Sequence, residues 1–555
     1  MLRPAFLPHF SQTLLLQALG FLVSVCVSVP IVVILLQWGT LGNGEQEIWQ
    51  HLFATKLGRL TLNTLVLVVG VGVGVSVLGV SLAWLVSVCE FPGRRHFEWA
   101  LMLPLAIPGY VMAFVFLGLF GFAGPVQTTL RNWFGNDVWF VDIQSPGAVI
   151  LVLTLVLYPY VYLLSRTAFL AQGRSLMDAA RVLGLSPIAA FLQVALPVAR
   201  PAIMAGVALA LMETLADFGA VSVFNFDTFT TAIYNAWYGL FNLTVAAQLA
   251  SLLLLFVVLA MTLEQYGRKF KRYTQDERRR SVQTYRLHGT HALAATLFCT
   301  LVIALAFVIP VIQLLVWVSS TISSELDSRY LEFFSHTVML ATMAAVVTVI
   351  IALLLALGKR LAGSKRLHGW HHFAERAATL GYALPGSVLA VGIMLTFTWL
   401  DRKLSTTLYL EPVLVGSLFA LLCAYVIRFL AVAHAPVEAG LQRIKPSVME
   451  AARSLGAKPK QVLWQLYVPL LQPGIFTALI IVFVDVMKEM PATLIMRPFG
   501  WDTLAVRIFQ MTTEGQWERA ALPALTLLLV GLVPVILLVK NSRAPVLMKG
   551  KFLAQ

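Results

Sequence analysis

Charged residues are scarce in this sequence. Asp, Glu, Lys and Arg make up only 12% of its 555 residues, whereas hydrophobic residues make up 59%. Soluble proteins average about 25% charged residues, because their surface must face water. A lipid bilayer instead requires apolar side chains on the outside of the protein. The deficit therefore excludes a soluble globular protein and predicts an all-α polytopic membrane protein.

The signatures of two kinds of site are also missing. The four cysteines stand singly at Cys26, Cys89, Cys299 and Cys423, and no CxxC pair occurs. Such spacing indicates neither a disulfide framework nor a zinc site. A phosphate-binding loop, GxxxxGK followed by Ser or Thr, is absent from the sequence as well. We infer that this chain is not an enzyme and does not itself hydrolyse ATP.

Long apolar stretches dominate what is present. A transmembrane helix needs about 20 mostly apolar residues, and about twelve stretches meet that condition. We interpret the first as a retained span rather than a cleaved signal peptide. The expected spans are 12–37, 61–89, 97–121, 147–168, 202–224, 240–266, 291–318, 336–358, 375–400, 412–434, 474–496 and 520–540.

The net charge of +14 is explained by membrane topology rather than by a nucleic-acid partner. With the N-terminus inside, 29 of the 40 Lys and Arg residues fall on the cytoplasmic side and nine fall outside, while Arg428 and Lys488 lie within spans. Cytoplasmic loops of membrane proteins carry such an excess of positive charge. We therefore expect both termini to be cytoplasmic.

An internal repeat divides the chain. MDAARVLGL (Met177–Leu185) matches MEAARSLGA (Met449–Ala457) at six of nine positions and an offset of 272 residues. AIPGYVMA (Ala106–Ala113) similarly matches ALPGSVLA (Ala383–Ala390) at an offset of 277 residues. Internal repeats of this kind are typical of transporters, whose substrate path lies between the repeats.

The repeat predicts two permease halves, 1–266 and 291–555, joined by a basic cytoplasmic linker at 267–290. Each half carries six expected spans, an even number, so both halves enter the membrane in the same orientation. The expected architecture is therefore two parallel six-helix halves.

One motif recurs between spans 4 and 5 and between spans 10 and 11. It consists of an acid and two alanines, three residues, a glycine, nine residues, and an apolar-x-apolar-Pro end. Its members are Asp178, Ala179, Ala180, Gly184 and Pro197 in the first copy and Glu450, Ala451, Ala452, Gly456 and Pro469 in the second. These segments, 175–200 and 447–472, resemble the EAA loops of binding-protein-dependent ABC permeases; Asp178 departs from the usual Glu but keeps the charge.

The motif also has a local physical basis. The capping boxes that begin at Ser175 and Ser447 predict the start of a helix. Gly184 and Gly456 are expected to end that helix in a left-handed conformation. Ser186 and the proline after it then suit the start of a second helix.

The resemblance implies partners and a location. In that family each EAA loop docks onto an ATPase subunit, so we expect two copies of a P-loop ABC ATPase. ATP and Mg are then used by those subunits, and this chain binds no cofactor. The resemblance further implies a periplasmic substrate-binding protein and a multi-pass location in the bacterial cytoplasmic (inner) membrane.

Acidic side chains within expected spans are the candidate translocation path, because ionisable residues inside a membrane are usually functional. Both acidic pairs are spaced i, i+4, which would place their carboxylates on one helix face. A second interpretation is internal neutralisation, in which Lys488 or Arg428 pairs with an acid. The candidates are Glu213, Asp217, Asp485, Lys488 and Glu489, with no metal ligands fixed.

The surrounding segments, Glu213–Trp237 and Asp485–Gln510, resemble the fused permeases of bacterial ferric iron importers. That resemblance implies ferric iron, or a ferric complex, moved from periplasm to cytoplasm by alternating access. The alternatives are a fused permease for thiamine, polyamine or phosphonate, a secondary transporter without an ATPase, and a membrane scaffold.

Two further groups are weak ligand candidates. We expect His371 and His372 to lie in a solvated cytoplasmic loop. Tyr158, Tyr160 and Tyr162 are expected to belong to an aromatic belt at the membrane interface.

Overall fold

A computed structural model describes most of the chain. The described residues are 7–39, 42–135, 140, 142–269, 285–361, 381, 384–409, 411, 413–442, 444, 447–448, 452, 454–456 and 461–543. Within them, eleven helical segments are long and apolar enough to cross a membrane. They correspond to all expected spans except 375–400, of which the first part lies outside the described residues. The prediction of an all-α polytopic membrane protein is confirmed.

The described helices form two compact units, each assembled from separate stretches of chain. Unit 1 comprises Met1–Asn43, Ala236–Ser251 and Asp327–Val506. Its elements are α1 (Leu7–Leu36), η1 (Gln37–Gly39), α15 (Ser328–Leu361), α17 (Gly386–Leu408), α18 (Leu418–Gln442), η5 (Val462–Tyr467), α21 (Val468–Lys488) and α22 (Pro491–Met496).

Unit 2 comprises Gly44–Asn235, Leu252–Leu326 and Arg507–Gln555. Its elements are α2 (Asn43–Thr55), α3 (Leu57–Val88), β1 (Cys89–Glu90), α4 (Arg94–Ala100), η2 (Leu103–Ala106), α5 (Gly109–Phe120), α6 (Pro125–Phe134), α7 (Pro146–Val182), α8 (Pro187–Ala190), η3 (Phe191–Ala195), α9 (Leu196–Ala216), α10 (Gly219–Val223), β2 (Tyr285–Arg286), α13 (Gly289–Ile303), η4 (Ala304–Val308), α14 (Ile309–Glu325) and α24 (Trp517–Arg543). The unit boundaries pass through α11 (Phe229–Tyr238), α12 (Leu243–Lys269) and α23 (Leu504–Thr513).

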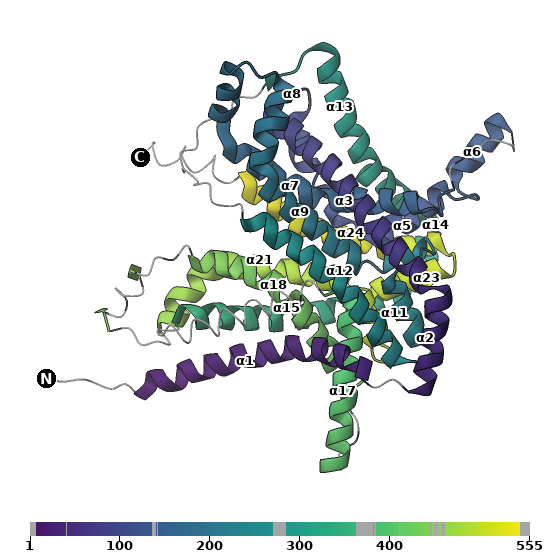
Figure 1. Cartoon of the computed structure of the whole chain (residues 1–555), viewed down its shortest axis with the longest axis vertical. Coiled ribbons are helices and arrows are strands. Elements are labelled where there is room, and N and C mark those ends of the chain that lie inside the picture. The colour runs from purple at the N-terminus through teal and green to yellow at the C-terminus, as the bar shows by residue number, and fades with distance from the viewer. Residues whose placement is uncertain are drawn as a thin grey trace. The chain divides into compact units, whose positions relative to one another are not determined.

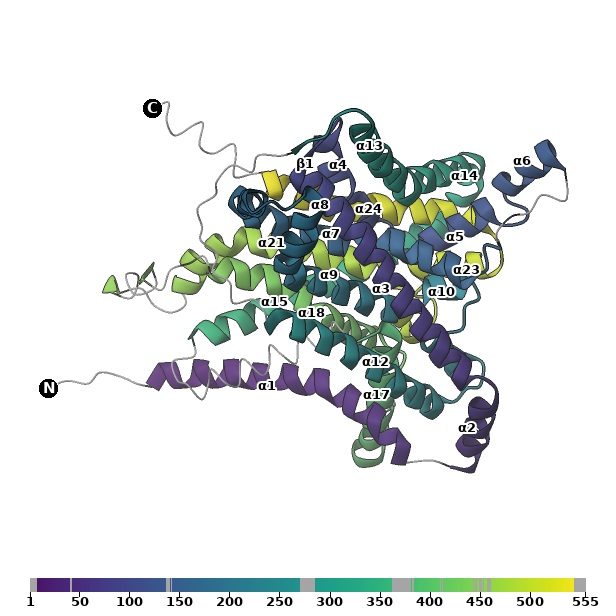
Figure 2. The same cartoon turned by 45° about the horizontal axis from the view of Figure 1, so that its top comes forward.

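The units are interleaved along the chain, whereas the predicted halves 1–266 and 291–555 are consecutive. In unit 1, α1 packs beside α15 and α17 (Figure 1). In unit 2, α13 packs beside α4, and α14 packs beside α5 and α24 (Figure 2). Unit 1 is built mainly from the second half of the sequence but contains the first span of the first half. Unit 2 is built mainly from the first half but contains the first span of the second half.

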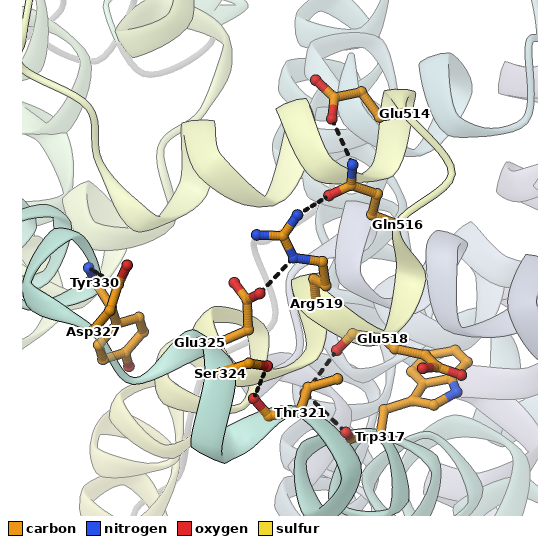
Figure 3. Close-up of polar contacts among 10 residues, drawn as sticks. All are labelled: Trp317, Thr321, Ser324, Glu325, Asp327, Tyr330, Glu514, Gln516, Glu518 and Arg519. Carbon is orange, nitrogen blue, oxygen red and sulfur yellow. Dashed lines mark hydrogen bonds and ion pairs between the residues drawn. The ribbon is translucent and has the colours of Figure 1, made fainter.

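A polar network closes unit 2 where α14 meets α24. Arg519 forms an ion pair with Glu325 and donates from Nη1 to Oε1 of Gln516 at 2.8 Å (Figure 3). The hydroxyl of Thr321 also lies 3.3 Å from the carbonyl oxygen of Glu518. These contacts fasten the first span of the second sequence half to the last.

Small residues let the central helices of unit 2 approach closely. A Cβ atom on Gly79 of α3 would lie 2.8 Å from Cβ of Val161 in α7. A Cβ atom on Gly206 of α9 would lie 2.8 Å from the Cα atom of the same valine. Backbone contact of this kind requires glycine and is typical of helix packing in membranes. It fixes α3, α7 and α9 as the core of this unit.

A two-stranded parallel pairing anchors the end of the linker to unit 2. Cys89 pairs with Tyr285, and Glu90 pairs with Arg286. Most of the predicted linker, residues 270–284, lies outside the described residues, as do His371 and His372.

Candidate functional site

The first EAA loop is an extension of a membrane-length helix. α7 continues without interruption from Pro146 to Val182. The prediction that a new helix starts at Ser175 was therefore wrong: nothing between the span and the motif breaks the helix, so the capping box has no terminus to cap. The backbone of Asp178 and Ala179 is helical, and Ala180 is buried.

The helix ends as the glycine predicts. Gly184 has φ +86°, and the amide of Leu185 donates to the carbonyl oxygen of Ala180 at 3.1 Å. This is the six-to-one bond of a Schellman motif, which satisfies a helix-end carbonyl. The next helix begins at Pro187, and the Ser186 hydroxyl accepts from the amide of Ala189 at 3.2 Å. The predicted helix–turn–helix is thus confirmed beyond the glycine.

Where the structure describes the second EAA loop, its backbone resembles that of the first loop. Gly456 has φ +81°, as Gly184 does at the same repeat position. Ser447 and Ala452 are helical. Glu450 and Ala451 lie outside the described residues.

An exposed leucine precedes each of these glycines, and sequence reasoning missed it. Leu183 is 81% exposed and Leu455 is 88% exposed, while both glycines have open space where a side chain would be. The signal was visible, because Leu-Gly occurs in both copies of the motif. Each loop therefore presents an apolar tip to its surroundings.

The base of the first loop is held by aromatic packing. Trp84 of α3 lies with its ring centroid 5.3 Å from that of Phe169 in α7 and 4.5 Å from that of Phe191 in η3. The side-chain amide Nε2 of Gln172 donates to the carbonyl oxygen of Ala195 at 3.0 Å. The two arms of the loop are therefore fastened to each other and to α3.

A π-helical turn lies in the last part of each loop. η3 precedes Pro197, and η5 precedes Pro469. Proline has no amide hydrogen to donate, which disrupts the regular bonding of the preceding turn. The amide of Leu196 accordingly bonds five residues back, to Phe191. Such turns often occur at functional sites, and here they are the entry into α9 and α21.

The candidate path acids lie at helix breaks rather than on continuous helices. α9 ends at Ala216, and Asp217 has an extended backbone with ψ 126°. α21 ends at Lys488, and Glu489 is likewise extended with ψ 112°. The expectation that each i, i+4 pair shares one helix face is therefore wrong, because the second acid of each pair has already left the helix.

At the first break, Asp217 caps the helix that follows it. Its Oδ1 accepts from the amides of Ala220 at 2.9 Å and Val221 at 3.2 Å. The hydroxyl of Thr230 donates to the carbonyl oxygen of Asp217 at 2.8 Å. Gly109 leaves room for the carboxylate, since a Cβ atom there would lie 3.0 Å from its Oδ2. Glu213 lies one turn earlier, within α9.

At the second break, Glu489 repeats that cap and adds an ion pair. Its Oε1 accepts from the amide of Ala492 at 2.9 Å, and its Oε2 lies 3.3 Å from Nε of Arg428 in α18. Their side chains are 4% and 11% exposed. Gly386 leaves room for both groups, because a Cβ atom there would lie 2.5 Å from the carboxylate. The interpretation of internal neutralisation requires that Lys488 or Arg428 pairs with an acid, and the pair between Arg428 and Glu489 is such a contact.

The remaining candidates have different settings. Asp485 interacts electrostatically with Lys488 near the end of α21. Tyr158 and Tyr162 do not belong to an exposed aromatic belt, because both are buried and their hydroxyls donate to the carbonyl oxygens of Leu101 and Glu98. Their hydroxyls brace α7 against the segment before α5.

No group of three or more metal-ligating side chains is gathered among the described residues.

Comparison with known proteins assigns a family. The binding-protein-dependent transport system inner membrane component matches residues 75–266 and again 361–543. The Fe(3+)-transport system permease protein FbpB 2 of Haemophilus influenzae is 29% identical over 96% of this chain and 99% of its own length. The molybdenum transport system permease protein ModB of Escherichia coli is 32% identical, over 29% of this chain and 70% of its own length.

Similarity extends to solved structures. A crystal structure of a bacterial alginate ABC transporter, in complex with a pentasaccharide-bound periplasmic protein, contains a chain that aligns with a TM-score of 0.36 and 17% identity. The alignment covers 45% of this chain and 93% of that chain. Since the two family matches cover most of the sequence, the chain belongs to the binding-protein-dependent transport system inner membrane components and contains their domain twice.

Proposed function

We propose that this chain is the membrane permease of an ATP-driven importer for ferric iron or a ferric complex. One chain supplies both permease domains, and each domain brings one EAA loop. Two loops imply two docking positions and hence two ATPase subunits. Those subunits bind ATP and Mg, and a periplasmic substrate-binding protein delivers the cargo.

The cargo assignment rests on one observation. The ferric iron permease FbpB 2 matches this chain from end to end, including both permease domains. The molybdenum permease ModB instead matches less than a third of the chain. Agreement over the full fused arrangement favours ferric iron over the other substrates of this family, among them thiamine, polyamines and phosphonates.

The docking assignment is supported by the geometry of the loops. Leu183 and Leu455 occupy the same repeat position and project from a left-handed turn with open space around it. Exposed apolar tips at the end of rigid helices are suited to a pocket on a protein partner. The charge distribution favours the cytoplasmic side for both loops and both termini.

Transport in a defined membrane tests the proposal. The chain is purified with its ATPase subunits, placed in liposomes, and supplied with its binding protein and radiolabelled ferric iron. We expect uptake that requires ATP inside the liposome and is not inhibited by molybdate or thiamine. Uptake of molybdate or thiamine in place of iron would reject the cargo assignment. Uptake driven by an ion gradient without ATP would favour a secondary transporter.

A further inference from the structure

The two units can be compared residue by residue, because their central helices pack in one register. Gly206 of α9 packs on the Tyr160–Val161 backbone of α7, and Gly474 of α21 packs on the Pro436–Val437 backbone of α18. We shift the first contact by the repeat offset of 272 to compare it with the second. The second contact then lies one helical turn before it along α21 and one helical turn after it along α18. Antiparallel helices in a common register behave in this way. Residues 272 apart near the breaks therefore occupy equivalent places.

The second break is surrounded by polar side chains. Arg428 pairs with Glu489 and donates from Nη1 to the carbonyl oxygen of Leu384 at 3.2 Å. The hydroxyl of Thr493 donates to the carbonyl oxygen of Glu489 at 2.6 Å, and it also lies 2.7 Å from the hydroxyl of Tyr425. Through these contacts, α18, α22 and the segment before α17 all bind the break.

The first break has apolar residues at those three places. Leu153, Val156 and Val221 correspond to Tyr425, Arg428 and Thr493, and all three are buried.

The ties of Asp217 are correspondingly weaker. Its carboxylate accepts from backbone amides of the helix that follows, and a neutral hydroxyl from Thr230 binds its carbonyl oxygen. Bonds between ionised partners are roughly twice as strong as neutral ones. Separating a buried ion pair also leaves an uncompensated charge. The second break is thus held more firmly than the first.

We propose that Arg428 is a positioning residue that holds the second helix break rigid, so that the first break, at Asp217, is the one that rearranges during transport. This inference rests on the proposed function for its place in the transport cycle. The two permease domains then have unequal roles: the break at Glu489 is a fixed support, and the break at Asp217 is the moving part. Glu489 is bound to Arg428 rather than offered to the cargo.

Hydrogen exchange measured by mass spectrometry tests the inference on the full transporter, with its ATPase subunits, in lipid nanodiscs. Amide exchange reports the free energy of local opening. We expect α22 amides such as Leu494 to exchange about tenfold or more slowly than α10 amides such as Ser222, after correction for intrinsic rates. Trapping the ATPases with vanadate should change exchange in α10 and leave α22 unaltered.

Substitutions then assign the difference to Arg428. Arg428→Met should raise exchange in α22 by about tenfold or more and leave α10 unchanged. Because that variant strands a buried carboxylate, the double variant Arg428→Met, Glu489→Gln provides a second measurement. It removes both charges and keeps an acceptor for the Ala492 amide, and it should loosen α22 in the same direction.

A matched control removes an ion pair elsewhere. Arg519→Met breaks the pair with Glu325 between α14 and α24, which includes no residue of either break (Figure 3). It should leave the exchange of α10 and α22 unchanged. The inference is overturned if wild-type α10 is as protected as α22, or if both Arg428 variants leave α22 unaltered. Failure of the proposed function would show separately, as absent ferric uptake in a wild-type transporter that retains the exchange difference.

Discussion

At the scale of single residues, backbone conformation limits what the EAA loops can contain. Gly184 and Gly456 both adopt positive φ, and a Cβ atom at either would have no described atom within 4 Å. The penalty we expect for substitution there is backbone strain. Substitutions at these two glycines therefore test the left-handed turn itself.

Replacing Gly456 with Val should cost about 1 kcal/mol or more, because a β-branched residue is strained at positive φ. We expect the variant to reach the membrane but to retain less ATPase on co-purification and to lose uptake. Gly456→Asn is the control, since Asn tolerates the left-handed region. Normal uptake in the double variant Gly184→Val, Gly456→Val would remove the coupling assignment.

The exposed leucines give a second prediction at this scale. Leu183→Ser and Leu455→Ser should leave protein abundance unchanged, because neither side chain contributes to the core. Each should weaken ATPase binding, measured as the subunit retained on the purified permease, and the double variant should weaken it most. Leu297 of α13 is also exposed, and Leu297→Ser provides a control outside the loops. Equal retention in all three would argue against docking through these tips.

At the scale of elements, a helix break places a charge where a continuous helix would not. Asp217 and Glu489 each end one helix and cap the next, so their carboxylates are bound by amides as well as by side chains. The break at Asp217 is therefore both a structural joint and a candidate contact for the cargo. Substitution by the matching amide separates these roles, because the amide oxygen still accepts hydrogen bonds.

Asp217→Asn should preserve the cap of α10 and remove the charge. If Asp217 lines the path, we expect normal protein abundance, normal ATPase retention and strongly reduced ferric uptake, measured in the liposome assay. A merely structural role predicts little change, because the hydrogen bonds to Ala220 and Val221 remain available. Wild-type uptake in Asp217→Asn would exclude this acid from the path.

At the scale of the whole molecule, the chain contains two family domains, and its two compact units are assembled from alternating stretches of the sequence. The first span of each sequence half joins the compact unit built mainly from the other half. Neither half is then expected to fold fully without the other. Fusion into one chain ensures that both are made together.

The charge distribution leads to a prediction about topology. Reporter fusions after Thr290 and at the C-terminus should both be cytoplasmic, because 29 of the 40 Lys and Arg residues then lie inside. A reporter that is active only in the cytoplasm measures this directly, and a fusion after Leu326 should give the opposite signal. A periplasmic result at Thr290 or the C-terminus would contradict the twelve-span topology.

The sequence by itself determined the membrane class, the repeat, the positions of the EAA loops and the left-handed glycines. These features depend on composition, on spacing and on the steric freedom of single residues, all of which are local. Only the tertiary structure decided that helices end at Asp217 and Glu489, that Arg428 binds Glu489, and that the first spans are exchanged between units. An extended residue inside an apolar segment is stable only when distant groups bind it, as the Thr230 hydroxyl and the Arg428 guanidinium do here. Helical periodicity holds no record of such partners, because they are brought together by packing between segments far apart in the chain.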